Sequence, residues 1–454
     1  MIGSDPVELL LLGTAAALGL LGFLLLRRSP RMVLAAWLAS VCLVPVWVVV
    51  RVGPFSLEPQ WVVAMGCLAA LVPLGARVRD RFTVPDLLMV VLVVAVLLGV
   101  VVGYWSLDTV YRAMLSWVVA YLLGRLLWRR LDLVLIYRGV AVAFVVVAVL
   151  ALAEAATGID VFVHLPGSAS LRAAWAPIQV RGGVPRAEAA FGHSIALGCS
   201  LATAVPITLA ARLRPAVTVA AVGLMSAAAA VTFSRIGMVT LGLGLVLTLV
   251  FLPTGLSRRL RISLAVAVGL LAVAVLPYVS RVFGAAGDEA TNSAAYRGDL
   301  LGLLGDARWL GLSGAAYQAP DGRDYFGTFR SIDNALLLLA LNTGLIPLLC
   351  AVLALAAAAV AVLSRRGTAP TIALVAQVPA FATVALITQY ATWVWFIAGL
   401  AVAAQVAATP VVVDRVRRQD PAHLTPSGDT LGTGLAPGAG HADATQVDVV
   451  RGAR

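Results

Sequence analysis

The chain alternates between long apolar runs and short polar segments. The runs are roughly 18 to 25 residues long, and an α-helix of that length crosses the ~30 Å hydrocarbon core of a bilayer. No stretch shows the two-residue alternation of a β-strand. The pattern therefore predicts an all-α, polytopic integral membrane protein with about thirteen (12–14) transmembrane helices.

Arginines mark one side of the predicted membrane domain. Loops rich in Lys and Arg stay in the cytoplasm, whereas loops on the other side are poor in them. This rule assigns to the cytoplasm the segments 27–31, 77–81, 125–132, 212–214, 258–261, 364–366 and the tail. It assigns to the outside the segments 51–60, 104–108, 157–192, 234–235, 281–333 and a short turn near Gln389. We expect a multi-pass protein of the cytoplasmic membrane with its N-terminus outside and its C-terminus inside.

The C-terminal tail differs in composition from the membrane domain. Residues 414–454 are rich in Gly, Pro, Thr, Asp and Ala and hold few large apolar side chains. Such a segment buries too little apolar surface to fold. We expect a disordered cytoplasmic tail at 414–454, after a membrane domain at 1–413.

Composition supports this reading and narrows the chemistry. Hydrophobic residues make up 61% of the chain and charged residues 12%, and the mean hydropathy is +0.97. The net charge of +11 follows the membrane topology, so it does not indicate nucleic-acid binding. All basic residues are Arg, which together with abundant Ala, Val, Leu and Gly is typical of GC-rich genomes such as those of actinobacteria. The four cysteines lie inside apolar runs without metal-ligand spacing, and we expect no cofactor.

Two long segments outside, the first outer loop (157–192) and the second outer loop (281–333), hold much of the polar sequence. The second carries five arginines and seven acids, and residues 296–310 have the spacing of a short amphipathic surface helix. Arg297 at the start of this helix could bind phosphate with its planar fork of donors. The alternative is a surface pairing of Arg297 with Asp299, or of Arg308 with Asp306, which contributes little.

Three further positions combine polar chemistry with a helix end. Asp333 precedes the apolar run from Ala335, where it could cap the helix or act as a half-buried base with a raised pKa. His193 could act as a base or bind a sugar, unless it is a bystander and Ser194 caps the next helix. Arg235 lies in a tight turn between two apolar runs, where it faces an anion or extends to the lipid headgroups.

Neither outer loop contains an Asp-x-Asp pair, so the sequence does not indicate a carboxylate-held Mg²⁺ or Mn²⁺. A diphosphate leaving group would have to be neutralised by arginines.

Four short motifs follow one another along the chain. They are Phe191–Gly198 (FGHSIALG), Thr232–Gly237 (TFSRIG), Arg297 with Trp309–Gly314 (WLGLSG), and Asp333-Asn334 followed by Asn342–Pro347 (NTGLIP). In this order, and with two long outer loops, the chain resembles the O-antigen ligase and polysaccharide polymerase family.

The resemblance implies a GT-C-like fold and a metal-independent, inverting glycosyltransferase. Its donor would be a glycan on undecaprenyl diphosphate. Arg235 and Arg297 would hold the diphosphate, Asp333 and His193 are the two candidate bases, and Arg186, Ser234, Asn334 and Tyr296 would support them. In the ligase branch a His commonly precedes the Asn that opens the helix, whereas this chain has Asp333 there. That departure favours polymerases of exopolysaccharide or capsule over transfer to lipid A core.

We therefore expect an enzyme that polymerises or transfers undecaprenyl-diphosphate-linked units at the outer face of the membrane. Its partners would be the lipid-linked donor, a glycan or lipid-linked acceptor, membrane lipid, a flippase and a chain-length regulator, without nucleic acid. The alternatives are a ligase that uses another acceptor, a transporter or flippase, and a membrane scaffold. Against transport, the predicted helices hold few ionisable groups, notably Arg138 and Glu154, and no internal repeat is visible.

Overall fold

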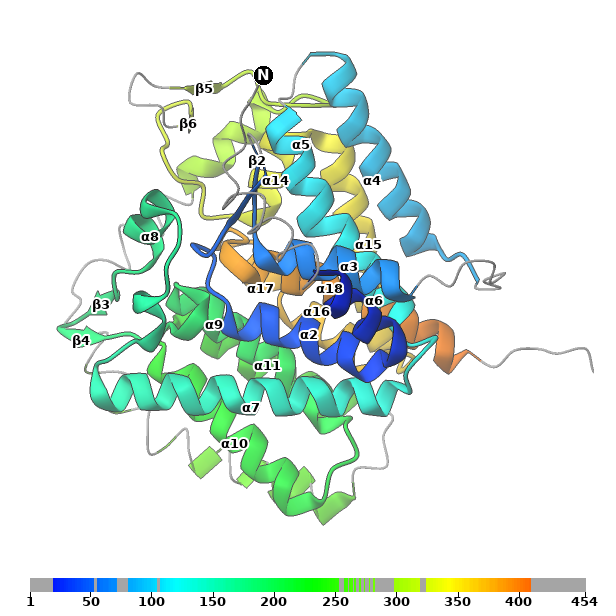
Figure 1. Cartoon of the computed structure of the whole chain (residues 1–454), viewed down its shortest axis with the longest axis vertical. Coiled ribbons are helices and arrows are strands. Elements are labelled where there is room, and N and C mark those ends of the chain that lie inside the picture. The colour runs from blue at the N-terminus through cyan, green and yellow to red at the C-terminus, as the bar shows by residue number, and fades with distance from the viewer. Residues whose placement is uncertain are drawn as a thin grey trace, which may run out of the picture. The chain divides into compact units, whose positions relative to one another are not determined.

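Figure 1 shows the computed structural model, which describes residues 19–52, 55–71, 81–103, 107–252, 298–318 and 324–409, with short pieces between 257 and 281. The described chain is mostly helical, as predicted. Its α-helices are α2 (Pro30–Leu43), α3 (Pro59–Leu71), α4 (Val84–Val101), α5 (Leu107–Ala113), α6 (Ala120–Leu127), α7 (Leu133–Thr157), α8 (Ala169–Trp175), α9 (Ser194–Leu209), α10 (Pro215–Val231), α11 (Arg235–Phe251), α14 (Ala335–Thr343), α15 (Leu345–Leu363), α16 (Ala369–Ala376), α17 (Val378–Phe381) and α18 (Thr388–Ala408). A π-helix and short 3-10 helices join them: η1 (Met114–Val119), η2 (Val161–His164), η3 (Ala189–Phe191) and η4 (Gly302–Asp306).

Several of these helices suit a membrane. In the part of the chain that the structure describes, five stretches are long and apolar enough to cross one: Val84–Val101, Val110–Leu127, Leu133–Thr157, Leu345–Leu363 and Thr388–Ala408. Further apolar helices are shorter: Pro30–Leu43, Pro59–Leu71, Ser194–Leu209, Pro215–Val231, Arg235–Phe251 and Ala369–Phe381. The chain is thus a helical membrane protein. The count of thirteen spans stays a prediction, because the expected first helix and the one near 262–280 lie partly or largely outside the described residues. The predicted tail at 414–454 lies outside them as well.

Aromatic side chains fill the middle of the helix bundle. The ring of Trp37 lies 5.3 Å from that of Phe396, and Trp393 lies 4.9 Å from Phe144 and 5.6 Å from Phe396, measured between ring centroids. The indole N–H of Trp393 donates to Thr203 Oγ1 at 2.6 Å, so its polar atom is satisfied although the ring is fully buried. These contacts join α2, α7, α9 and α18 into one core.

Glycines allow α6 and α18 to cross closely. A Cβ built on Gly124 would lie 2.1 Å from the carbonyl oxygen of Phe396, and one on Gly399 would lie 1.9 Å from that of Tyr121. Only a residue without a side chain fits at such a distance. Small residues at a crossing let membrane helices approach through their backbones.

Two predicted helices are broken. The apolar run 335–363 divides at Gly344, whose φ of +103° is outside the helical range, so only α15 is long enough to span. The next run divides into α16 and α17 and leaves the helical state at residues 382–387. The turn expected near Gln389 therefore lies just before it, and Gln389 itself is in α18.

The polar loops contain short strands that the sequence did not predict. Antiparallel pairs form between β1 (Val50–Val52) and β2 (Phe55–Leu57), β3 (Val180–Arg181) and β4 (Val184–Pro185), and β5 (Ala316–Gln318) and β6 (Asp324–Phe326). Strands of two or three residues are too short to show a two-residue alternation. The surface helix expected at 296–310 is also shorter: it is helical at 298–301, continues as η4, and is extended from Ala307.

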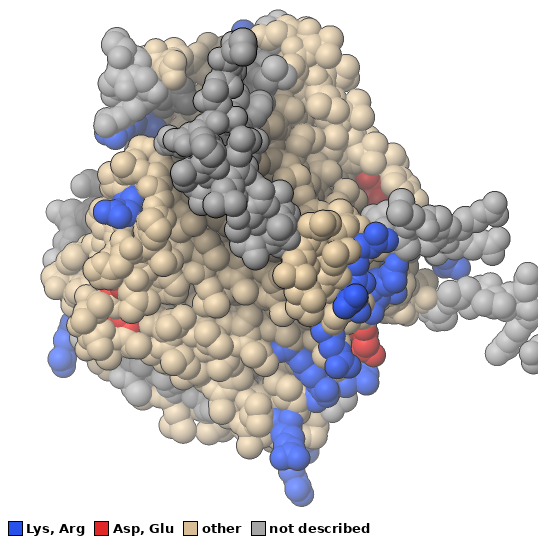
Figure 2. Space-filling model, viewed as in Figure 1, with Lys and Arg blue, Asp and Glu red and all other residues tan. Residues whose placement is uncertain are grey.

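Hydrogen bonds join segments that are far apart in the chain. Arg138 of α7 donates to the carbonyls of Ala211 at 3.1 Å and Arg212 at 3.2 Å, at the start of the segment 212–214 that was assigned to the cytoplasm. Ser168 N–H donates to Trp47 O at 2.8 Å, which joins the first outer loop to the segment between α2 and β1. Figure 2 shows arginines gathered over the part where α2 and α7 begin in Figure 1. We call this the arginine end, and the end with the two outer loops the loop end.

Candidate functional site

The first polar cluster lies where the first outer loop meets the turn between α10 and α11. Arg186 is buried, and its Nε donates to Thr232 O at 2.9 Å while Nη1 donates to Gln179 Oε1 at 3.1 Å. Arg181 Nη1 donates to Phe233 O at 3.0 Å. The loop is therefore fixed to the backbone of the TFSR turn by two guanidinium groups.

His193 is the N-cap of α9, and its Nδ1 accepts the N–H of Ile195 at 3.1 Å. Burial, and then the charge of Arg186, lower the pKa of His193 from 6.5 to about 4, so the ring is neutral at neutral pH. With Nδ1 accepting, the proton of a neutral ring is on Nε2. This arrangement makes His193 a hydrogen-bond donor. The alternative in which Ser194 caps the helix is wrong: Ser194 is buried and donates to Gln179 Oε1 at 3.0 Å.

Ser234 and Arg235 begin α11. Ser234 is the N-cap, and its Oγ accepts the N–H of Gly237 at 3.1 Å. Arg235 is exposed in the first turn. A Cβ on Gly237 would lie 3.1 Å from the Cα of Gly198 in α9. The FGHSIALG and TFSRIG motifs thus meet at a close helix crossing, which places His193 and Ser234 at neighbouring helix starts.

The second polar cluster is built by the second outer loop and α14. Gly311 N–H donates to Thr343 O at 2.9 Å, and Ser313 N–H donates to Leu341 O at 2.7 Å. The WLGLSG motif therefore pairs with the end of α14, where the NTGLIP motif begins. The second outer loop and α14 also share a small apolar core, which consists of Leu300, Leu303, Phe326, Ile332, Leu337 and Leu341.

Asn334, and not Asp333, caps the helix that follows. Asn334 is the N-cap of α14, because its Oδ1 accepts the N–H of Leu337 at 2.9 Å. Asp333 is exposed rather than half-buried, and it accepts from Ser331 Oγ at 3.1 Å. The capping interpretation of Asp333 is wrong, and its carboxylate remains open to solvent.

Arg297 and Tyr296 lie outside the described residues. The structure brings Arg186, His193, Ser234 and the start of α11 together in the first cluster, and it places Asp333 and Asn334 in the second. The convergence of both clusters on one substrate stays a prediction.

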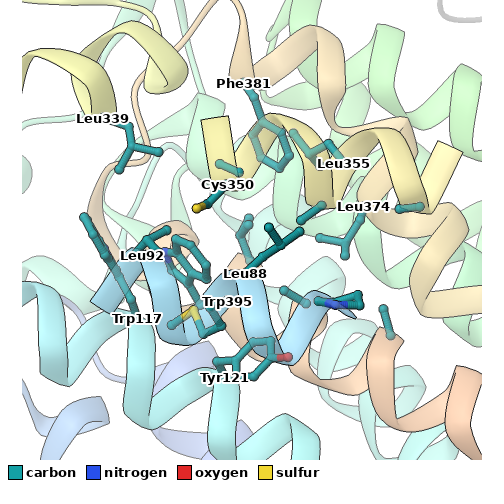
Figure 3. Close-up of a pocket in the computed structure, with 18 of the residues that line it drawn as sticks. Leu88, Leu92, Trp117, Tyr121, Leu339, Cys350, Leu355, Leu374, Phe381 and Trp395 are labelled. Atoms are coloured by element: carbon teal, nitrogen blue, oxygen red, sulfur yellow. The ribbon is translucent and has the colours of Figure 1, made fainter. Parts of the chain in front are cut away.

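An apolar cavity of about 540 Å³ lies between α4, η1, α14, α15 and α18 (Figure 3). Short side chains make up part of its wall: Ala351, Ala354, Ala358 and Ala361 of α15, with Ala398 and Ala401 of α18. Leu88, Leu92 and Trp395 line its middle, as Figure 3 shows. Its loop end reaches Arg112, Ala335 and Asn342, and its arginine end reaches Thr83 and Gln405.

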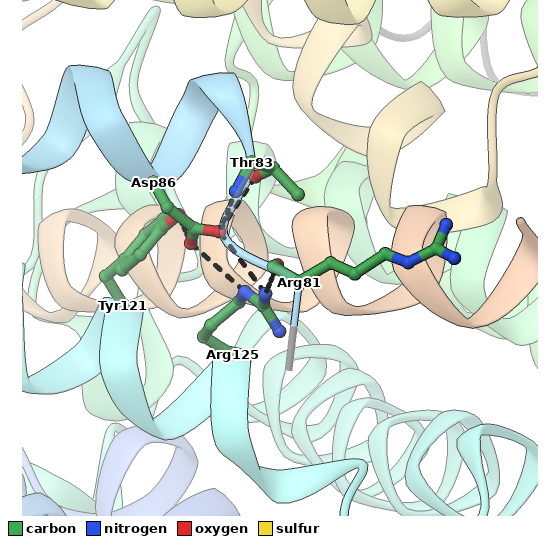
Figure 4. A network of polar contacts seen from close by, with 5 residues as sticks. All are labelled: Arg81, Thr83, Asp86, Tyr121 and Arg125. Atoms are coloured by element: carbon green, nitrogen blue, oxygen red, sulfur yellow. Dashed lines mark hydrogen bonds and ion pairs between the residues drawn. The ribbon is translucent and has the colours of Figure 1, made fainter. Parts of the chain in front are cut away.

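A buried ion pair lies beside the arginine end of the cavity (Figure 4). Arg125 Nε is 3.1 Å from Asp86 Oδ1, Tyr121 OH donates to the same oxygen at 2.8 Å, and Thr83 N–H donates to Oδ2 at 3.0 Å. Arg125 also donates to Arg81 O at 2.9 Å. Sequence reasoning missed this network. Its only signal was Asp86 three residues after Thr83, at the start of an apolar run, which is the spacing of a capping box.

The side chains found here are cations, hydroxyls, an imidazole and single carboxylates. Among the described residues, no group of three or more His, Cys, Asp or Glu side chains could hold a metal ion. Arginines are the cations available to an anionic ligand at the loop end.

No protein-family model matches this chain, and no curated protein sequence matches it.

Proposed function

We propose that this protein is a glycosyltransferase that polymerises or transfers glycan units from undecaprenyl diphosphate at the outer face of the cytoplasmic membrane. One observation carries the proposal. Two polar clusters are built on helix starts at the loop end, and an apolar cavity between the helices opens toward the same end. A lipid-linked sugar needs both environments, one for its polar head and one for its chain.

The cavity suits part of an isoprenoid chain. Its walls are apolar, and two of the helices that form it, α4 and α15, also expose large apolar side chains, among them Val90, Leu97, Leu349 and Leu353. Such surfaces are compatible with lipid, so a chain could enter sideways from the bilayer. Arg112 at the loop end adds a cation near an anionic head group, which sequence reasoning did not identify.

The reaction would join an acceptor hydroxyl oxygen to the anomeric carbon of the donor sugar. The bond from that carbon to the diphosphate oxygen breaks, and the hydroxyl proton passes to a base. Asp333 is the better base of the two candidates, because His193 already uses Nδ1 to accept a backbone N–H. His193 then donates through Nε2, while Arg235 and Arg297 stabilise the charge on the leaving diphosphate. No step requires a metal, and attack opposite the leaving group inverts the configuration.

A lipid transporter is the second candidate, because the cavity extends from Arg112 at one end to Thr83 and Gln405 at the other. A transporter moves the lipid-linked unit unchanged, whereas a transferase lengthens its glycan. The two functions therefore leave different lipid-linked products.

To test this, the chromosomal gene of the producing cell is replaced by a gene that encodes the Arg235→Ala or the Asp333→Asn variant. We expect each variant to lose long glycan chains, with single repeat units remaining on the lipid. Arg330→Ala is the control for both, since Arg330 is exposed like Arg235 and belongs, like Asp333, to the second outer loop. Normal chain lengths in both variants would contradict the proposal. Loss of lipid-linked units from the outer leaflet would instead indicate transport.

A further inference from the structure

The backbone that leads into His193 is held by side chains from two distant helices. Glu154 lies in the last turn of α7 and is only 6% exposed. Its Oε1 accepts the N–H of Glu188 at 3.0 Å, and its Oε2 accepts the N–H of Ala189 at 2.7 Å. One carboxylate therefore binds two consecutive backbone amides.

Gln389 at the start of α18 holds the next residue. It is fully buried, and its Nε2 donates to Ala190 O at 2.7 Å and to Val44 O at 2.8 Å. Residues 188–190 are thus bound in succession by α7 and α18, and the second anchor also ties them to the end of α2.

This backbone needs such support. Ala189 has a φ of +46°, in the left-handed region that residues with a side chain avoid. Gly192 also has a positive φ, and His193 follows it directly. A backbone in this unfavourable conformation persists only when contacts with the surrounding structure hold it there.

We propose that Glu154 and Gln389 are positioning residues, which fix residues 188–193 so that His193 presents Nε2–H to the substrate. The inference rests on the proposed function for the role of His193. It does not require either residue to touch substrate.

Two near-isosteric variants test the anchors. Glu154→Gln keeps the volume and one acceptor oxygen, but it places an NH₂ against a backbone N–H. Gln389→Met keeps the length and removes both donated hydrogen bonds. Asp86→Asn is the control, because Asp86 is an equally buried acid whose partners lie at the arginine end.

The readout is the modification of His193 by diethyl pyrocarbonate as a function of pH, followed by peptide mass spectrometry on the purified full-length protein. The reagent attacks neutral imidazole, so the midpoint of the rate reports the pKa of His193, which is about 4 in the intact arrangement. We expect the midpoint to rise toward 6.5 in both anchor variants and to stay near 4 in Asp86→Asn, even where that variant is less stable.

Polymer length in cells completes the test. A raised midpoint together with a shortened glycan supports the positioning role. We expect the rate of glycan polymerisation in the anchor variants to fall roughly hundredfold, which is the usual effect of a misplaced catalytic group. An unchanged midpoint in both anchor variants would overturn the inference. A raised midpoint with normal glycan would support the anchors but count against a role for His193 in the proposed reaction.

Discussion

At the scale of single residues, the charges buried in this protein fall into two classes. Asp86 is matched by Arg125, so its charge is compensated, and removing one partner of such a pair costs about 3–5 kcal/mol. Glu188 is different, because it is only 1% exposed and lies close to two other acids, Glu154 and Asp160. Burial comes first among the causes that raise its pKa, from 4.5 to about 8.

The raised pKa of Glu188 predicts a pH-dependent stability. The acids Glu154 and Asp160 raise it further, whereas the Gln179 amide and Arg186 lower it. Because the folded state binds the proton more tightly than the unfolded chain, the contribution of Glu188 to stability falls between pH 4.5 and about 8. We expect Glu188→Gln to flatten this slope, measured as the free energy of unfolding in detergent across that range. An equal slope in both proteins would assign the dependence to other groups.

At the scale of elements, the sequence predicted the presence of helices better than the positions where they end or break. Runs such as 133–157 were readable because apolar length alone specifies a span. The break at Gly344 could not be predicted in this way, because it depends on Trp309 and Leu310, which lie against that glycine in the folded chain. The same limit applies to site residues: His193 and Ser234 were found from local motifs, whereas Glu154 and Gln389 act on backbone far away in the chain.

The crossing of α6 and α18 gives a prediction at this scale. Gly399→Ala would place a methyl group 1.9 Å from the carbonyl oxygen of Tyr121, so the helices must separate. We expect a loss of about 1–3 kcal/mol in stability, the usual cost of overpacking. The control is Gly223→Ala in α10, where a Cβ meets nothing within 4 Å and helix propensity should add about 1 kcal/mol. The two variants are compared by thermal unfolding in detergent. Similar midpoint temperatures would contradict the close crossing of α6 and α18.

At the scale of the whole molecule, the cavity and the polar clusters together define the proposed site. The sequence did not locate the cavity. Alanines are abundant throughout the chain, and only the folded structure shows which of them line the cavity.

Filling the cavity should stop the proposed reaction without unfolding the protein. Ala358→Phe places a ring among the lining residues, whereas Ala356→Phe changes an exposed position on the same helix that does not line the cavity. We expect Ala358→Phe to lower the yield of long glycan chains at least tenfold. The ring would weaken lipid binding by about 1.4 kcal/mol or more, which is a tenfold loss of affinity. Gel analysis of surface glycan measures this, and equal yields from both variants would separate the cavity from the activity.

The position of α14 has a consequence for how the enzyme would recognise a complete substrate. This nine-residue helix shares Leu337 and Leu341 with the core of the second outer loop and turns Leu336 and Leu339 toward the cavity. Asp333 comes just before it. A lipid chain in the cavity would therefore contact the helix that begins two residues after Asp333. Under the proposed function, the lipid would then act as an activating signal as well as an anchor, and we expect a soluble glycan diphosphate without its chain to be a poor donor.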